Sequence, residues 1–207
     1  HLAPGLFCVG GDSHSPTGGA FGAYMFGIGA TEMAGVLATG EIWIKVPETI
    51  LMSWRNQLSA YVTAKDMMLA MCRKIGMGGG RYQAIQYAGE TIQALSMQER
   101  MTLSNMAAEL GAQAGLIAPD EATVAFVQAA GGKVPANWRD FQIEAAESAE
   151  NVMQFDAASL EPQIAAPHSP ENADAADAFR NISFDVAYIG ACTGAKYVDL
   201  AAAAEVL

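Results

Sequence analysis

The chain has 207 residues, 52% of them hydrophobic, and a formal net charge of −11. This length allows one sizeable hydrophobic core or two small ones, as in a globular protein. The negative charge argues against nucleic acid as a partner, because binding depends on neutralising phosphates with Lys and Arg, and it has the wrong sign for an anionic membrane surface. No apolar run approaches the length of a membrane span.

Cysteine usage and the chain ends add two expectations. The three cysteines form no disulfide framework, which suits a reducing cytoplasm. The chain begins with His1 and stops inside the alanine-rich stretch 201–207, whose composition is that of a helix interior. We therefore expect a cytoplasmic protein and a sequence that is a fragment of a longer one.

The first part of the chain alternates predicted strands and helices. Residues 6–9 form an apolar run typical of a buried strand, and paired glycines end it. Residues 30–39 carry apolar side chains at helical spacing, with Gly40 as the expected stop. Residues 41–46 and 49–54 have strand patterns separated by a proline turn.

The alternation continues through the middle of the chain. Thr63 is the expected N-cap of a helix over 64–75, whose methionines share one face. They could indicate a soft-metal site, but core packing is the better interpretation, because no converging ligands accompany them. The glycine-rich stretch 76–80 lacks the Gly-Lys-Ser/Thr ending of a phosphate loop, so we interpret it as a connection. A strand over 84–87 follows.

Two further helices frame the next strand. Ser96 and Glu99 form a capping box that predicts a helix from Met97 to about Gly111. We expect a strand over 115–118 and then a helix that opens at 119–121 and ends at Gly131-Gly132.

The remaining residues have weaker patterns. Residues 134–181 are rich in Ala, Glu, Asp and Pro, which predicts a partly irregular connector in which His168 is a surface histidine. The last clear strand is predicted over 184–189, with a helix after it. We therefore predict an α/β fold in three parts: an α/β domain over 1–133, the connector over 134–181, and the start of a further α/β unit over 182–207.

Chemistry-bearing side chains gather in the turn after the first strand. Asp12, Ser13 and His14 place a carboxylate, a hydroxyl and an imidazole in a row, and a dense run of glycines follows. Ligands bind in α/β sheets where a strand turns into a helix, and glycines allow close approach of the backbone. The residues alone leave two interpretations open: a ligand site, or a tight turn whose Asp12 or Ser13 caps a helix.

The stretch from Gly11 to His14 resembles the Gly-Asp-Ser-His signature of the aconitase superfamily. Further matches follow in the family's order at 26–29, 36–40, 46–49, 62–66, 87–90, 94–121 and 189–193. The resemblance is greatest to the large, catalytic subunits of bacterial 3-isopropylmalate dehydratases. It implies the three-layer α/β/α sheet domain of the aconitase type.

The resemblance also implies roles for individual residues, which are Asp12, His14 and Glu109 as catalytic groups, Ser13 and Asn105 as substrate-binding groups, and Cys192 as a ligand of a [4Fe–4S] cluster. Glu109 would hold His14 ready to donate a proton, so we expect the two side chains to be hydrogen-bonded or close neighbours. We expect His14 and Cys192 within about 12 Å, the span of an ordinary pocket. Without the resemblance, Cys192 is typical of an inert small hydrophobe and Glu109 of a solvated helix charge.

The implied function is that of a hydro-lyase. The full enzyme would remove water from an isopropylmalate-like 2-hydroxy-dicarboxylate and return it with the hydroxyl moved, as in leucine biosynthesis, and a separate small subunit would complete the site. The family's Cys-x-x-Cys pair is missing here, so we expect the cluster in the full-length protein and neither cluster nor activity in this chain alone. Alternatives are a related hydratase acting on dimethylmalate, citrate or homocitrate, and a non-catalytic iron-responsive or scaffold protein with the same fold. The family's Gly-Ser-Cys-Thr-Asn reads Gly-Ala-Cys-Thr-Gly at 190–194, which leaves the substrate open.

Overall fold

A four-stranded parallel sheet forms the centre of the molecule. The computed structural model describes residues 2–142, 151–191 and 193–207. The strands lie in the order β5-β4-β3-β6, and their bounds are Ala114–Ile117, Ala84–Ala88, Thr49–Arg55 and Asn151–Asp156. Every neighbouring pair in this sheet is parallel. With the helices that connect the strands, the sheet confirms the predicted α/β class.

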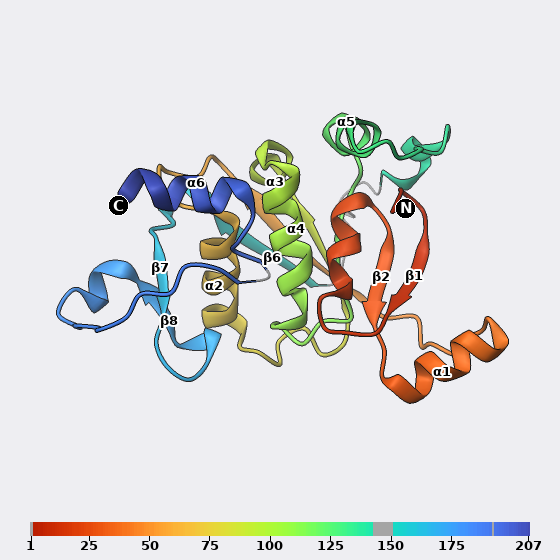
Figure 1. Cartoon of the computed structure of the whole chain (residues 1–207), viewed down its shortest axis with the longest axis horizontal. Helices are drawn as coiled ribbons and strands as arrows, with labels where there is room; N and C mark the ends of the chain where they lie inside the picture. Colours follow the sequence, from red (N-terminus) through yellow and green to blue (C-terminus); the bar gives the residue numbers. More distant parts are fainter. Residues whose placement is uncertain (1, 143–150, 192) are drawn as a thin grey trace.

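Helices α2 (Ala64–Ile75) and α4 (Met97–Asn105) lie side by side against this sheet (Figure 1). They belong to the β3–β4 and β4–β5 connections, and the second connection also holds the short helix α3 (Glu90–Ala94). The predicted core packing of α2 is confirmed, because its apolar face has no exposed surface. The residues of this face are Met67, Met68, Met71 and Cys72.

Helices α2 and α4 begin at the residues that their capping patterns predict. The Thr63 N–H and hydroxyl each donate to the Asp66 carboxylate at 2.7 Å. The Ser96 N–H and hydroxyl donate to the Glu99 carboxylate at 3.1 and 2.9 Å. These bonds link residues three apart at the helix start, so the sequence pattern alone was enough to place both helix starts.

A second sheet of two strands carries the turn that contains His14. Strands β1 (Phe7–Gly10) and β2 (Tyr24–Gly27) are parallel, and the 3₁₀ helix η1 (Ser15–Phe21) lies between them in sequence. The predicted burial of the first strand is wrong: Phe7 is 51% exposed and the other residues of β1 are only half-buried. Helix η1 packs against α4 and β5 (Figure 1), so the turn that precedes it lies beside the main sheet's helical layer.

Helix α1 (Ala30–Thr39) spans the predicted residues and ends at Gly40, whose φ of 74° is the left-handed conformation common at helix ends. It projects from the body of the molecule (Figure 1), and none of its residues is buried. The predicted strand over 41–46 is wrong: these residues form no strand in the described structure, and Trp43 is 87% exposed. A strand needs a partner for its backbone groups, and no described segment pairs with this one.

Close packing at Gly19 joins η1 to β5. A β-carbon on Gly19 would lie 1.8 Å from the carbonyl oxygen of Gly115, so only glycine lets the two backbones approach this closely. We expect Gly19→Ala to lower the free energy of unfolding by about 1–3 kcal/mol, measured by urea denaturation, because one backbone must shift.

The matched control is Gly35→Ala in α1, where no atom of the described residues lies within 4 Å of the added carbon. This variant should be neutral or raise the free energy of unfolding by about 0.5–1 kcal/mol, since alanine favours a helix interior. Equal denaturation midpoints for the two variants would show that η1 and β5 are not packed as described.

The stretch 134–181, expected as a connector, also supplies strands. Strand β6 from this stretch is the edge of the main sheet beside β3, although the chain reaches it from β5 at the opposite edge. Strands β7 (Gln163–Ala165) and β8 (Ala173–Ala175) form an antiparallel pair that packs against α2. The short 3₁₀ helices of this part are η3 (Trp138–Phe141), η4 (Ala157–Ser159), η5 (Pro170–Asn172) and η6 (Ala176–Phe179).

The last residues also differ from the prediction. The predicted strand over 184–189 is wrong: this described segment forms no strand, and the alternating side chains of Phe184, Val186 and Tyr188 are exposed. Helix α6 (Tyr197–Val206) follows, without a buried residue. In the part of the chain that the structure describes, no helix has both the length and the apolar character needed to cross a bilayer.

Candidate functional site

The turn between β1 and η1 brings Asp12 and His14 together. The backbone N–H of His14 donates to Asp12 Oδ1 at 3.0 Å, and the Ser15 hydroxyl donates to the same oxygen at 3.4 Å. An aspartate that accepts an N–H two residues on stabilises a tight turn. Its other oxygen, Oδ2, lies 3.9 Å from His14 Nδ1, close enough for attraction whenever the imidazole is protonated.

This turn is open to solvent. The side chains of His14 and Asp12 are 47% and 68% exposed, and Ser13 is exposed as well. An open hollow of about 550 Å³ lies at the turn, with Asp12, His14, Ser15 and Thr17 among its walls. A small molecule in this hollow would meet an imidazole and a carboxylate, and both are groups that can transfer protons.

Asn105 reaches the same turn from the end of α4. Its side chain is buried, and its Nδ2 donates to the Thr17 hydroxyl oxygen at 2.8 Å. The Thr17 hydroxyl donates in turn to the carbonyl oxygen of His14 at 2.6 Å. The structure therefore joins Asn105 to the His14 backbone through one intervening side chain, and direct binding of substrate by Asn105 stays a prediction.

Glu109 lies just beyond the end of α4. The helix predicted to continue to about Gly111 ends at Asn105 and tightens into the 3₁₀ helix η2 (Met106–Ala108). A 3₁₀ helix turns about 120° per residue, whereas an α-helix turns about 100°. Four residues past Asn105, Glu109 has therefore rotated off the helix face that Asn105 occupies.

The surroundings of Glu109 belong to the core beside α2. Its Oε2 atom is buried and has no hydrogen-bond partner among the described residues. Burial, with a smaller contribution from the charge of Glu109, raises the pKa of the Cys72 thiol to about 11. Helix α2, which carries Cys72, lies on the opposite side of α4 from η1 (Figure 1). Among the described residues the carboxylate within 4.0 Å of His14 is that of Asp12, so partnership between His14 and Glu109 stays a prediction.

The cysteines do not assemble into a cluster site in the described part of the chain. Cys192 lies outside the described residues, so its predicted closeness to His14 stays a prediction. Cys72 is fully buried with a raised pKa, and Cys8 is half-buried on β1. A thiol that stays protonated is a poor ligand for iron. No group of three His, Cys, Asp or Glu side chains among the described residues could hold a metal ion, so these residues do not fit an iron–sulfur cluster by themselves.

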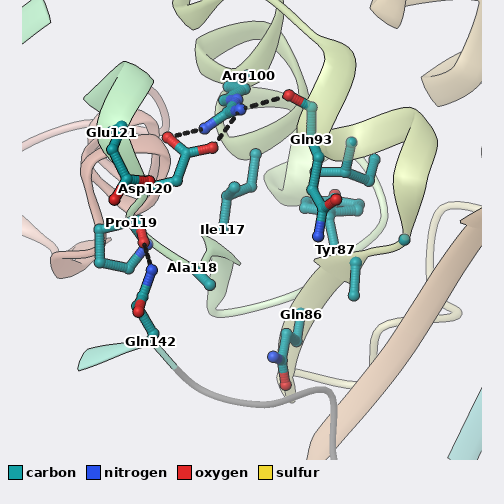
Figure 2. Close-up of a pocket in the computed structure, with 13 residues that line it drawn as sticks. Gln86, Tyr87, Gln93, Arg100, Ile117, Ala118, Pro119, Asp120, Glu121 and Gln142 are labelled. Carbon is teal, nitrogen blue, oxygen red and sulfur yellow. Dashed lines mark hydrogen bonds and ion pairs between the residues drawn. The ribbon is translucent and has the colours of Figure 1, made fainter. Parts of the chain in front are cut away.

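Figure 2 shows a second cavity, of about 490 Å³, at the carboxyl ends of β4 and β5. The guanidinium of Arg100, 1% exposed, donates to both carboxylate oxygens of Asp120 at 2.8 and 2.7 Å. It also donates to the carbonyl oxygens of Leu95 and Gln93. The only cation among the described walls of this cavity is thus already neutralised, which disfavours a dicarboxylate ligand there.

The sequence predicted a helix start at 119–121 but neither partner of this ion pair. In the structure the carboxylate of Asp120 caps helix α5 (Glu121–Ala129) and accepts the Thr123 N–H at 3.0 Å. Its partner Arg100 lies 20 residues earlier in the chain, and no local pattern joins the two.

Comparison with known proteins places the chain in a family. A family model described as "Aconitase family (aconitate hydratase)" matches residues 1–180. The chain is 41% identical over 207 residues to the probable 3-isopropylmalate dehydratase large subunit of Methanothermobacter thermautotrophicus, covering 100% of this chain and 49% of that protein. The 3-isopropylmalate dehydratase large subunit of Moorella thermoacetica is 40% identical over 206 residues, which cover 100% of this chain and 48% of that protein. The large subunit from Aquifex aeolicus is 38% identical over 205 residues, which cover 99% of this chain and 47% of that protein. The chain thus spans about half the length of these curated relatives. Because the family model matches most of its residues, the chain belongs to the aconitase family.

Proposed function

We propose that this chain is part of the large subunit of a hydro-lyase of the 3-isopropylmalate dehydratase type. Such an enzyme removes water from a 2-hydroxy-dicarboxylate and adds it back with the hydroxyl on the neighbouring carbon. One observation supports the proposal most: an Asp12–Ser13–His14 turn at an open hollow, in a chain 40–41% identical along its whole length to relatives named as this large subunit.

In this proposal the turn handles the hydroxyl that leaves. His14 donates a proton to the hydroxyl oxygen as the C–O bond breaks, while a base from the small subunit takes the proton from the neighbouring carbon, whose C–H electrons form the double bond. In the return direction water adds across this bond, and His14 takes its proton back from that water. Asp12 keeps the turn in shape through its bond to the His14 N–H. The exposed hydroxyl of Ser13 binds a substrate carboxylate. Glu109 partners His14 in the assembled protein.

Cofactor and partner belong to the same proposal. The full-length protein carries a [4Fe–4S] cluster with Cys192 as one ligand, and such a cluster supplies a Lewis-acidic iron when bound. The remaining ligands come from outside the described residues. Since the relatives are named large subunits, a separate small subunit is the proposed partner. The proposal includes no nucleic-acid or membrane partner, because the formal net charge of −11 has the wrong sign for both. The proposed location is the cytoplasm, from the cysteine usage.

An assay of the assembled enzyme tests this function. The full-length protein, reconstituted with iron and sulfide and combined with its small subunit, is offered isopropylmalate, dimethylmalate, citrate and homocitrate in parallel. We expect the highest kcat/KM for isopropylmalate. The reaction is measured by the absorbance of the unsaturated acid that forms. A preference for another of the four acids would keep the hydro-lyase class and reject the substrate. If a protein with full iron content converted none of the four acids, the proposed enzyme function would be rejected and the non-catalytic scaffold alternative favoured.

A further inference from the structure

Thr17 connects two segments of the candidate site that are far apart in the sequence. Its hydroxyl donates to the carbonyl oxygen of His14 at 2.6 Å and accepts from Asn105 Nδ2 at 2.8 Å. The Thr17 N–H donates to the same carbonyl at 3.1 Å. A hydroxyl has one hydrogen to donate and lone pairs to accept, so a single Thr17 oxygen completes both contacts.

The amide of Asn105 faces away from solvent. The residue is only 7% exposed and belongs to the last turn of α4, a helix packed against η1. A buried amide needs hydrogen-bond partners, and Thr17 takes one of its donors. In this arrangement Asn105 contacts Thr17 in the wall of the hollow, and His14 and Asp12 are the groups that line the hollow beside it.

The backbone before His14 is also held by a hydrogen bond and by close packing. Asp12 Oδ1 accepts the His14 N–H, and the Asp12 carbonyl lies so close to Gly27 of β2 that a β-carbon there would come within 2.2 Å of its oxygen. Both backbone groups of His14, its N–H and its carbonyl, are therefore bonded to side chains. The imidazole extends from a backbone whose position depends on Asp12 before it and on Thr17 after it.

We infer that Thr17 is a positioning residue for His14, and that Asn105 acts through it as a second positioning residue. The inference rests on the proposed function, in which His14 exchanges a proton with the substrate. The link between Thr17 and Asn105 ties the turn to α4, so that the imidazole keeps one distance and one angle to a ligand in the hollow. Small displacements of a reacting group lower the rate steeply while leaving ligand affinity largely unchanged.

The test compares Thr17→Val, which keeps the shape and loses the hydroxyl, with Thr17→Ser, which keeps the hydroxyl. In the chain itself, amide hydrogen exchange of residues 14, 15 and 17 should be faster in Thr17→Val by about three- to tenfold, the factor expected for lost hydrogen bonds of ordinary net strength. In the assembled enzyme, kcat should fall about ten- to a hundredfold with KM within about twofold, and Thr17→Ser should restore kcat.

Two further variants separate positioning from general damage. Asn105→Ala combined with Thr17→Val should lose no more kcat than the worse single variant, because both remove the same link. The matched control is Thr39→Val in α1, whose hydroxyl also donates to a carbonyl oxygen, that of Gly35 at 2.9 Å, and which should leave kcat unchanged.

The outcomes are distinct. Multiplied losses in the double variant, or wild-type exchange in Thr17→Val, would overturn the inference. The exchange measurement needs no turnover, so an assembled protein that converts none of the hydroxy acids would reject the proposed function while exchange still decides whether Thr17 holds the turn.

Discussion

Replacing Arg100 by methionine is expected to lower the free energy of unfolding by about 3–5 kcal/mol, the usual cost of breaking a buried ion pair from one side. The guanidinium is 1% exposed and donates to both oxygens of Asp120 and to two backbone carbonyls. Methionine fills similar space but leaves the Asp120 carboxylate and both carbonyl oxygens without these donors. Urea denaturation of the chain, followed by circular dichroism, measures the difference.

The control is Arg180→Met, because Arg180 makes the same kind of ion pair with Asp177 at the surface. Its guanidinium donates at 2.9 and 2.8 Å, but both side chains are 72% exposed. Exposed ion pairs contribute about 1 kcal/mol or less, so this variant should denature almost like the wild type. Equal losses for both variants would show that burial of Arg100 is not what makes its pair important.

Acid dependence gives an independent check on the same pair. Burial alone would raise the pKa of Asp120, but hydrogen bonds from Arg100 and Thr123 and the charge of Arg100 lower it below its ordinary value of 3.8. A carboxyl group whose pKa is lower in the folded state stabilises the fold above the unfolded pKa, and this contribution is lost as the pH falls through the folded pKa. The wild type should therefore lose more stability below about pH 4 than Arg100→Met does. Asp156, whose pKa is lowered chiefly by a hydrogen bond from Asn56, titrates equally in both proteins and cancels from the comparison.

Replacing His14 by asparagine is expected to lower kcat of the assembled enzyme about 10²- to 10⁴-fold, the usual contribution of a general acid–base group. Asparagine keeps the turn, because the Asp12 carboxylate bonds to the backbone N–H at this position and not to the ring. The imidazole is 47% exposed, so its loss should change the melting temperature little. Steady-state kinetics together with a thermal melt of the same preparation separate the two effects.

The control for this prediction is His168→Asn. His168 is also exposed, and it lies between β7 and η5, outside the residues that line the hollow. Its replacement should leave both kcat and the melting temperature unchanged. An His14→Asn enzyme that keeps kcat within about threefold of the wild type would remove His14 from the proposed chemistry.

Local structure in this chain followed from short stretches of sequence. Helices α1 and α2 have the predicted bounds, and α4 and α5 begin as predicted, because each start or stop is decided within a few residues. Asp66 and Glu99 accept hydrogen bonds from the residues three before them, and Gly40 adopts the left-handed conformation that ends a helix. The turn of Asp12 and His14 was visible for the same reason, since its bond spans two residues.

The strands predicted over 6–9, 49–54, 84–87 and 115–118 are confirmed to within one residue at each end, as β1, β3, β4 and β5. Other strand predictions were decided by the tertiary structure. Residues 41–46 and 184–189 carry strand-like apolar patterns and form no strand in the described chain, whereas 151–156 lay in a stretch of weak pattern and became β6. A strand exists only where another strand pairs with its backbone, and β3 supplies that partner for β6. Pairing of this kind joins residues about a hundred positions apart, so a pattern within one segment cannot predict it.

In the candidate site, too, some features were predictable from the sequence and others depended on the tertiary structure. The sequence by itself, with its family resemblance, pointed to Asp12, Ser13 and His14 as one turn. Only the tertiary structure showed that Thr17 meets Asn105 across 88 positions and that α4 ends at Asn105 in a 3₁₀ turn instead of continuing to about Gly111. Bonds within a turn depend on neighbouring residues, but contacts between side chains on different elements depend on how those elements pack, and packing is a property of the whole chain.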